Sequence, residues 1–258
     1  MRTILWRRVT TSGDTLEARL AQLEAELEHA RKASDAQALQ LERYAADLRE
    51  TYKAERAQRA RLQASYMSTV RALSNAVEAR DSYTGKHAER VAAYGLTIAR
   101  TMGSRLAEDP TTEFGFLLHD VGKVAVPDAI LYKPAPLTEE ERELMSRHPV
   151  IGAQILRGIE FLGEAKNVVR HHHERWDGTG YPDGLEGDEI PLAARVFAVA
   201  DTLDALTTDR PYRTAATLPF AREVITAASG TQFDPQVVDA FTVVPDAEFD
   251  RIRLETGV

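Results

Sequence analysis

Histidine and aspartate are concentrated in the middle of this sequence, in positions that suit metal binding. Six of the seven histidines lie between His87 and His173, and three of them stand together in the stretch HHHERWDGTGYP. The strongest local signal is the pair His119-Asp120, which directly follows the apolar residues 116–118. A helix that buries these apolar residues would carry the pair into the interior, where unpaired charge is costly. A metal ion bound by the pair would remove that cost.

The available side chains restrict the chemistry. Cysteine is absent, which excludes disulfides, thiolate nucleophiles and sulfur-rich zinc sites and suits a reducing compartment. Neighbouring helical residues point about 100° apart, so His172 and His173 could approach one metal from two sides or serve two metals. Two-metal sites commonly share a bridging carboxylate. Asp120 is the candidate for that role, and Asp201 is a second acid that the sequence predicts to be buried.

The N-terminal region must form an element of its own. Between Gly13 and Gly85 there is neither glycine nor proline, and Ala, Leu, Glu, Arg and Gln dominate, which is helix composition. One face repeats apolar residues at alternating steps of four and three, as in a parallel coiled coil: Leu16, Leu20, Leu23, Leu27 and Ala30. We predict a tail (1–13) and a coiled-coil helix (14–83) that dimerises and passes on a signal. The alternatives are a passive spacer and a helix folded back on itself.

The remaining residues, 84–258, show shorter helical patterns that glycine and proline interrupt. Candidate helices cover residues 86–102, 111–119, 150–157, 164–174, 192–208, 220–228 and 235–241. Thr138 and Glu141 have the spacing of a capping box, which opens another helix. Almost no stretch alternates with period two. The sequence therefore predicts an all-α protein, with one long loop from Trp176 to Pro191.

Charge and hydropathy exclude some functions. The net charge is −8, and the excess of acids lies after residue 84. General binding to nucleic acid depends on Lys and Arg that neutralise phosphates, so we expect no nucleic-acid partner. The apolar stretch MRTILWRRVT is too short to span a bilayer and lacks the pattern of a signal peptide. We expect a cytoplasmic protein without a membrane span.

The chain resembles the HD-GYP family of the HD phosphohydrolase superfamily from about residue 78 to 241. Four motifs carry this resemblance, in order: HDVGK, the HP of His148-Pro149, HHERWDGTGYP and DTLDALTTDRPYR. The resemblance implies a helical bundle with two or three metals that hydrolyses cyclic di-GMP, a bacterial second messenger, to pGpG or GMP. Some members place a glutamate where this chain has Tyr83, so we predict two metals. The resemblance favours Fe or Mn, although Ni, Co and Zn suit the same ligands.

The resemblance also assigns residues. It implies that the metal ligands are His87, His119, Asp120, His148, His172, His173 and Asp201. Asp120 and Lys123 would be catalytic, with water activated by two metals as the nucleophile and Lys123 on the scissile phosphate. Substrate contacts would come from Lys123, Gly180, Tyr181, Pro182, Arg210 and Arg213. The loop could instead serve packing or bind a partner protein, and the two arginines could form surface ion pairs.

Two neighbours of the motif have other expected roles. The HHE pattern leaves His171 outside the ligand set, as a supporting or packing residue, and Trp176 is expected to anchor the core. Other functions stay open at this point. The chain could hydrolyse another cyclic nucleotide or the linear product, or it could be a weakly active regulatory module that senses cyclic dinucleotides and binds partners. Intact ligand positions favour the hydrolase.

Overall fold

The computed structural model describes residues 10–80, 86–209 and 214–256. Within these ranges the chain is helical and contains no β-strand, only two isolated β-bridges, so the all-α prediction is confirmed. The chain divides into two compact units, Met1–Ala64 and Ser65–Val258. In the described ranges, none of the helices is both long enough and apolar enough to cross a membrane.

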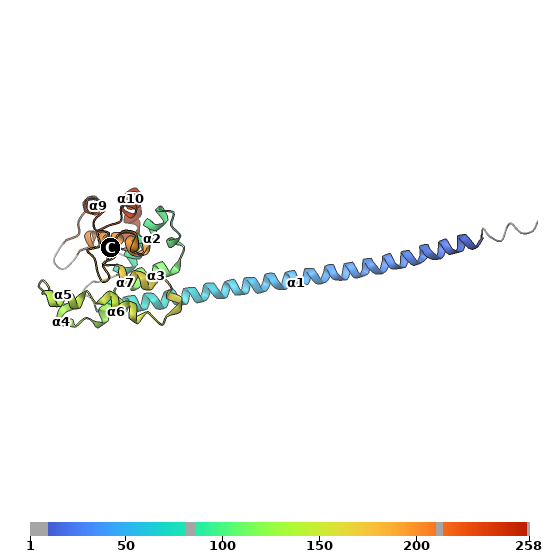
Figure 1. Ribbon diagram of the computed structural model, residues 1–258, viewed down its shortest axis with the longest axis horizontal. Helices are drawn as coiled ribbons and strands as arrows, with labels where there is room; N and C mark the ends of the chain where they lie inside the picture. Colours follow the sequence, from blue (N-terminus) through green and yellow to red (C-terminus); the bar gives the residue numbers. More distant parts are fainter. Residues whose placement is uncertain (1–9, 81–85, 210–213, 257–258) are drawn as a thin grey trace, which may run out of the picture. The chain divides into compact units, whose positions relative to one another are not determined.

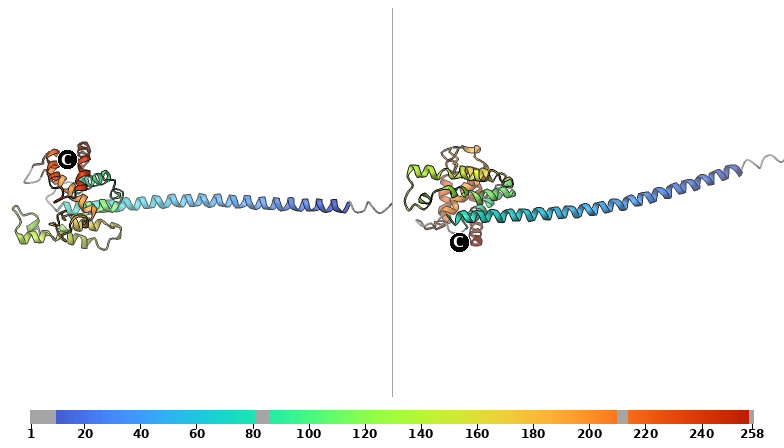
Figure 2. Two further views of the ribbon diagram at one scale, coloured as in Figure 1. Left: turned by 45° about the horizontal axis from the view of Figure 1, so that its top comes forward. Right: turned by 90° about the horizontal axis from the view of Figure 1, so that it is seen from below.

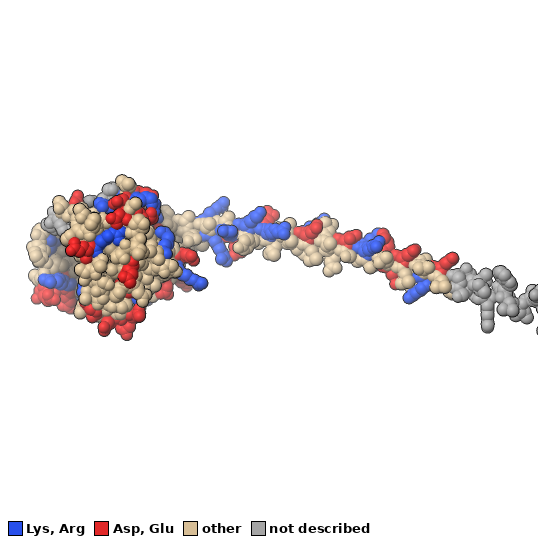
Figure 3. All heavy atoms as spheres, turned by 90° about the horizontal axis from the view of Figure 1, so that it is seen from above, with Lys and Arg blue, Asp and Glu red and all other residues tan. Residues whose placement is uncertain are grey.

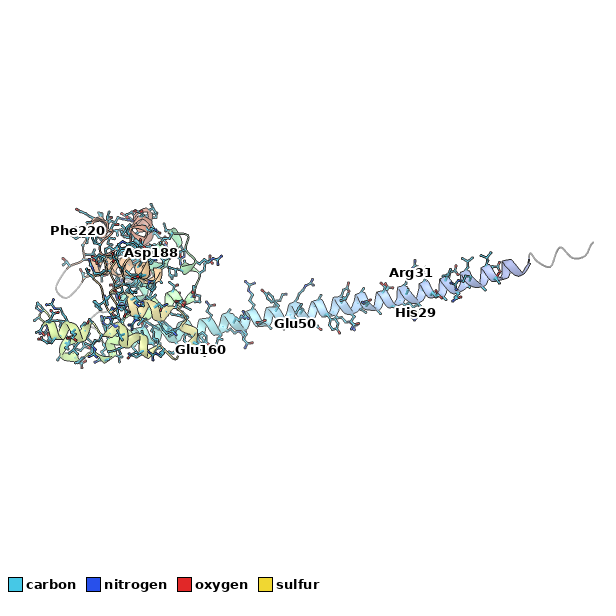
Figure 4. The ribbon with its side chains drawn as sticks, in the orientation of Figure 1. His29, Arg31, Glu50, Glu160, Asp188 and Phe220 are labelled. Carbon is cyan, nitrogen blue, oxygen red and sulfur yellow. The ribbon has the colours of Figure 1, made fainter. Side chains whose placement is uncertain are left out.

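The first unit consists of helix α1 (Thr10–Glu78), whose last turns belong to the second unit. The helix is uninterrupted, so the fold-back alternative is wrong. The predicted seam leucines are exposed along it, from 47% for Leu23 to 63% for Leu16. Acidic and basic side chains are interspersed along its surface (Figure 3). His29, the histidine outside the central group, is exposed on this helix (Figure 4).

The second unit is a bundle of short helices (Figure 1). Its α-helices are α2 (His87–Thr101), α3 (Pro110–Leu118), α4 (Asp128–Leu131), α5 (Glu139–Met145), α6 (His148–Ile155), α7 (Ala165–His171), α8 (Leu192–Thr207), α9 (Leu218–Ala227), α10 (Pro235–Val243) and α11 (Asp246–Thr256). Its 3-10 helices are η1 (Arg105–Ala107), η2 (Val121–Ala125), η3 (Glu160–Leu162) and η4 (Gly187–Glu189). The sequence analysis did not predict α4 or α11.

Helices α2 and α8 pack against each other at the centre of this bundle, and α3 packs on both α2 and α7. Helices α4 and α5 lie on the opposite side from α11 in both views of Figure 2. The core contains large side chains from distant segments, including Ile98, Phe116, Phe197 and Phe241, each fully buried. Burial of an aromatic side chain of this size stabilises the fold by roughly 2–3 kcal/mol.

Side-chain caps begin several of these helices. Asp109 accepts the Thr111 N–H at 2.8 Å and Pro110 occupies the first turn of α3, which suits its fixed φ and missing N–H. The predicted capping box is confirmed at α5, where Thr138 and Glu141 each accept a backbone N–H of the other. Asp234 caps α10 in the same way as Asp109 caps α3. Local sequence signals thus set where these helices begin.

The second unit begins earlier than the predicted boundary at residue 84. Val70 and Ser74 are buried, at 1% and 4% exposure, and the ring of Tyr66 stacks on Phe161 with centroids 4.1 Å apart. The last turns of α1 therefore pack into the bundle as well as continuing the long helix. A repeat that predicts one continuous helix cannot show where this packing begins.

Candidate metal centre

Five helices of the second unit bring the predicted metal ligands together. Helix α3 buries Phe116, Leu117 and Leu118, as predicted, and ends directly before the His-Asp pair. The first turns of α2 and α6, the end of α7 and the middle of α8 supply the others. The predicted ligands so placed are His87, His119, Asp120, His148, His172, His173 and Asp201.

Four of these residues form a compact cluster. One ligand atom from each of Asp120, His148, His172 and His173 lies within 4.8 Å of the others. Asp120 Oδ1 is 3.2 Å from His148 Nε2 and 3.9 Å from His172 Nε2. Two donors at about 2.0–2.2 Å from one cation are at most about 4.4 Å apart, so these two distances suit a single ion. We call these four residues the four-ligand cluster.

The imidazole rings are oriented as metal ligands require. In three histidines Nδ1 lies within 2.9 Å of the backbone carbonyl three residues earlier. A carbonyl can only accept, so Nδ1 donates its proton, and in a neutral ring this leaves the lone pair on Nε2. The three are His119, His148 and His172.

The distance between two of these Nε2 atoms shows whether the donor set fits a metal ion. His148 Nε2 and His172 Nε2 are 3.2 Å apart in a buried position. If both rings are neutral, neither nitrogen has a proton to share, and the two lone pairs repel. A cation between them would accept both lone pairs, so the donor set fits a bound metal.

The carboxylate of Asp120 faces two groups at once. Oδ1 points to the four-ligand cluster, whereas Oδ2 lies 3.0 Å from His119 Nε2 and 2.7 Å from Lys123 Nζ. His119 in turn has its ring centroid 5.5 Å from that of His87. A carboxylate placed in this way has an oxygen available on each side, and the bridging role of Asp120 stays a prediction.

The second part of the centre is the His87–Asp201 pair, with His87 Nε2 3.4 Å from Asp201 Oδ1. The ring of His87 is oriented by Asp204, whose Oδ2 accepts from Nδ1 at 2.7 Å. Asp204 is fully buried and also accepts from the buried guanidinium of Arg90 at 2.6 Å. A carboxylate behind a ligand histidine fixes its tautomer and raises its basicity.

Burial and charge shift the pKa values at the centre in opposite directions. Burial and the neighbouring His148 lower the pKa of His173 to about 3, and the pKa of His172 also falls well below its ordinary value, mainly through burial. Burial by itself lowers the pKa of His87. The hydrogen bond to Asp204 and the charge of Asp201 outweigh that effect and raise the pKa to about 9. Burial raises the pKa of Asp120, yet His119 and Lys123 hold it well below its ordinary value. His172 and His173 are therefore neutral near pH 7, the form that binds a metal.

A cavity of about 200 Å³ opens onto these groups. Lys123 contributes to its wall beside Asp120, and the end of α1 contributes Ser74, Val77 and Glu78. A second cavity, of about 270 Å³, adjoins His172, His173 and Asp201 and is lined by Gly180 and Tyr181 of the predicted loop. The centre is thus accessible from two cavities within the described residues.

The loop after α7 is held tightly to the centre. Buried Glu174 accepts the backbone N–H groups of Asp183 and Leu185 at 2.7 and 3.2 Å. A side chain on Gly180 would place Cβ 2.5 Å from Glu174 Cα, so only glycine permits this approach. The ring of Tyr181 stacks on His173 with centroids 4.8 Å apart. Pro182 follows in the same loop.

Other predicted residues have mixed outcomes. His171 turns to Asp183, with Nε2 3.1 Å from Oδ2, and is not in the four-ligand cluster, as expected. Trp176 is half-buried beneath the guanidinium of Arg195 and is not a buried core residue. The remaining predictions fall on Arg210, Arg213 and Tyr83, which lie outside the described residues.

Sequence reasoning missed the residues that orient the ligands. Asp204 lies one helical turn after Asp201, and Glu174 directly follows His173. That spacing beside a ligand was the available signal, because acids rarely occupy a core without a partner. No comparable signal identified Ser74 or Glu78, since both belong to the long helix.

Residues 71–237 match a family model described as HD domain. The chain belongs to the HD domain family. This confirms the resemblance that the motifs indicated. The matched range contains all seven predicted metal ligands.

Curated relatives share this region. The chain is 44% identical to the cyclic di-GMP phosphodiesterase response regulator RpfG of Xanthomonas campestris pv. campestris. The match covers 67% of this chain and 46% of the relative. It is 42% identical to a cyclic di-GMP phosphodiesterase of Thermotoga maritima, over 69% and 49%. It is also 42% identical to 3'3'-cGAMP-specific phosphodiesterase 2 of Vibrio cholerae, over 65% and 32%. The chain therefore spans half or less of the length of these relatives.

Two solved structures show the same fold. A cyclic GMP-AMP specific phosphodiesterase of Vibrio cholerae superposes with a TM-score of 0.51 at 19% identity, over 71% of this chain and 52% of that one. The HD domain of the phosphodiesterase PgpH of L. monocytogenes gives a TM-score of 0.50 at 16% identity, over 72% and 97%. The helical bundle is therefore an HD-type bundle.

Proposed function

We propose that this chain is a metal-dependent phosphodiesterase that hydrolyses cyclic di-GMP to pGpG or GMP. The observation that carries the proposal is the position of Asp120, whose two oxygens face the four-ligand cluster on one side and His119 with Lys123 on the other. Two relatives named as cyclic di-GMP phosphodiesterases, 44% and 42% identical, support the choice of substrate.

The cofactors in this proposal are two divalent transition metals. One would be held by the four-ligand cluster, and the other by the His87–Asp201 pair with His119, and Asp120 would be shared. Nitrogen and carboxylate donors suit Fe, Mn, Ni, Co or Zn, and Fe or Mn remain our choice. When bound, such a pair of metals would lower the pKa of water, which would supply a nucleophile near neutral pH, and would stabilise charge on phosphoryl oxygens.

The chain's own residues hold and orient the substrate. Lys123 places an ammonium group beside Asp120 in the wall of the first cavity, where it would neutralise a phosphoryl oxygen of the scissile phosphodiester. Tyr181 and Gly180 line the second cavity, and the ring of Tyr181 offers a face for a guanine base. Pro182, Arg210 and Arg213 stay predicted substrate contacts.

The proposed assembly is a parallel homodimer formed by α1. A long helix with an exposed leucine seam would bury that seam against a second copy, because isolated helices gain little from an apolar face in water. The exposed seam leucines support this. The same proposal includes a partner protein at the loop that carries Gly180, Tyr181 and Pro182. It also includes a cytoplasmic location, which suits the absence of cysteine.

A second substrate has specific support. One relative at 42% identity is named 3'3'-cGAMP-specific, so this dinucleotide is the alternative. A regulatory module with little activity is less favoured. Such a module would not need to keep four ligand atoms close enough together to bind one metal ion.

The test uses protein purified without oxygen and loaded with Mn(II) or Fe(II). Cyclic di-GMP, 3'3'-cGAMP and pGpG are supplied in separate reactions, and products are separated by chromatography. We expect cyclic di-GMP to be cleaved, and Asp120→Ala to lower turnover by at least about 100-fold, since it removes a ligand of both metals. Equal turnover in this variant, or cleavage of 3'3'-cGAMP alone, would contradict the proposal.

A further inference from the structure

Helix α2 begins at His87 without a capping side chain of its own. The preceding residue, Lys86, has a left-handed φ of 66° and its side chain makes no capping hydrogen bond. The first amides of a helix lack carbonyl partners within the helix, and an oxygen from the N-cap side chain usually accepts one of them. Here the oxygen comes from another helix, because Glu78 Oε1 accepts the Ala88 N–H at 2.6 Å.

Ser74 makes a complementary contact one turn earlier on α1. This buried hydroxyl donates to the carbonyl of Leu117 at 2.7 Å. Leu117 lies in the last turn of α3, where carbonyls lack partners within the helix. Residues four apart lie on the same helix face. One face of α1 therefore satisfies a donor at the start of α2 through Glu78 and an acceptor at the end of α3 through Ser74.

These two helix ends carry different parts of the candidate metal centre. Helix α2 starts with His87, and α3 leads directly into His119 and Asp120. Ser74 and Glu78 also line the cavity that contains all three residues. The end of α1 is thus attached to both sides of the centre at the point where the ligands leave their helices.

We propose that Glu78 is a positioning residue for the metal centre, with Ser74 in a supporting role. By capping α2, Glu78 holds His87 at the distance from Asp120 at which the His87–Asp201 pair can bind the second metal. The inference rests on the two-metal centre of the proposed function. It also gives α1 a direct effect on that centre, since one hydrogen bond joins the last residue of the long helix to the first turn of α2.

The experiment counts metals bound to Glu78→Ala and Glu78→Gln after reconstitution, by elemental mass spectrometry and metal titration. Glu78→Ala removes the acceptor, and we expect the second metal to bind about 10-fold more weakly, as when other supporting partners of ligands are removed. Glu78→Gln keeps an acceptor oxygen and should restore most of the affinity. Wild-type affinity in Glu78→Ala, or an equal loss in Glu78→Gln, would overturn the capping role.

Glu113→Ala is the matched control. It breaks the ion pair of Glu113 with Arg71 at 3.1 Å, which also joins α1 to α3 but does not line the cavity. This variant should keep both metals with unchanged affinity. A loss equal to that of Glu78→Ala would mean that any loosening of α1 has this effect, and would overturn the proposal.

A double mutant separates positioning from general destabilisation. If Glu78 acts through the His87–Asp201 pair, Glu78→Ala should add no further loss of metal to Asp201→Ala, whereas additive losses would refute this route. If Glu78→Ala does not fold, Ser74→Ala must show a weakened second metal for the proposal to stand. Metal is counted without substrate, so failure of the proposed hydrolysis and failure of this inference give different results.

Discussion

Replacement of Gly122 by alanine should separate two segments that carry ligands of the same proposed metal. Gly122 lies in η2, two residues after Asp120, and packs on the backbone of α6 where that helix begins with His148. A Cβ at this position would lie 1.9 Å from the carbonyl oxygen of His148, whereas ordinary contacts begin at 3.4 Å. The obstacle is backbone, so η2 and α6 would have to move apart by about 1.5 Å, at a cost of about 1–3 kcal/mol for the overpacked contact.

That displacement exceeds what one metal can tolerate. Asp120 Oδ1 and His148 Nε2 are 3.2 Å apart, and a movement of about 1.5 Å along this line would bring them to about 4.7 Å. Two donors at about 2.0–2.2 Å from one cation are at most about 4.4 Å apart, so Asp120 and His148 could no longer bind the same ion. We therefore expect Gly122→Ala to lose the metal of the four-ligand cluster and to lower turnover by about 100-fold.

Metal titration and steady-state hydrolysis measure these effects, and circular dichroism checks that the variant is folded. Gly158→Ala is the control, because a Cβ there has no neighbouring atom within 4 Å, and it should match the wild type in both assays. If folded Gly122→Ala bound metal with wild-type affinity, close packing of η2 on α6 could not be what positions Asp120 against His148.

Three further predictions concern stability. Asp204→Ala should lower the free energy of unfolding of the metal-free protein by about 3–5 kcal/mol, because it removes the carboxylate that faces the buried guanidinium of Arg90. Chemical denaturation measures this loss, and a value below about 1 kcal/mol would show that the pair contributes little. A chelator should abolish turnover and lower the melting temperature, since the Nε2 atoms of His148 and His172, 3.2 Å apart, would lose the cation that both contact. An unchanged midpoint in calorimetry would argue against a bound metal. The hydrogen bond from Arg170 holds the pKa of Asp183 below its ordinary value, so this ion pair is complete above about pH 4 and is lost as the pH falls below it. Amide exchange at residues 183–185 should then become faster relative to α8, and equal protection across that range would show that the pair does not hold the loop.

The sequence alone determined the features that depend on local patterns. The long run without glycine or proline predicted α1, the Thr138 and Glu141 spacing predicted the cap of α5, and three apolar residues before His119-Asp120 predicted that this pair would be carried inward. The ligand types were also available, because their order and spacing resemble a known family. The helix and cap predictions depend on local patterns, where the geometry of a helix is known in advance, whereas the ligand set came from motifs spread over residues 78–241.

Only the tertiary structure showed how residues far apart in the sequence meet. In the sequence, Asp204 is one acid in a helical segment, and the structure places it between His87 and Arg90. Glu78 is one of many glutamates in the long helix, and the structure shows that it caps α2. The beginning of the compact unit at Ser65 follows from the same cause, since Val70 and Ser74 are buried by segments that follow them in the chain. Such contacts depend on how whole helices pack, and a helical repeat specifies which face is apolar without specifying what covers it.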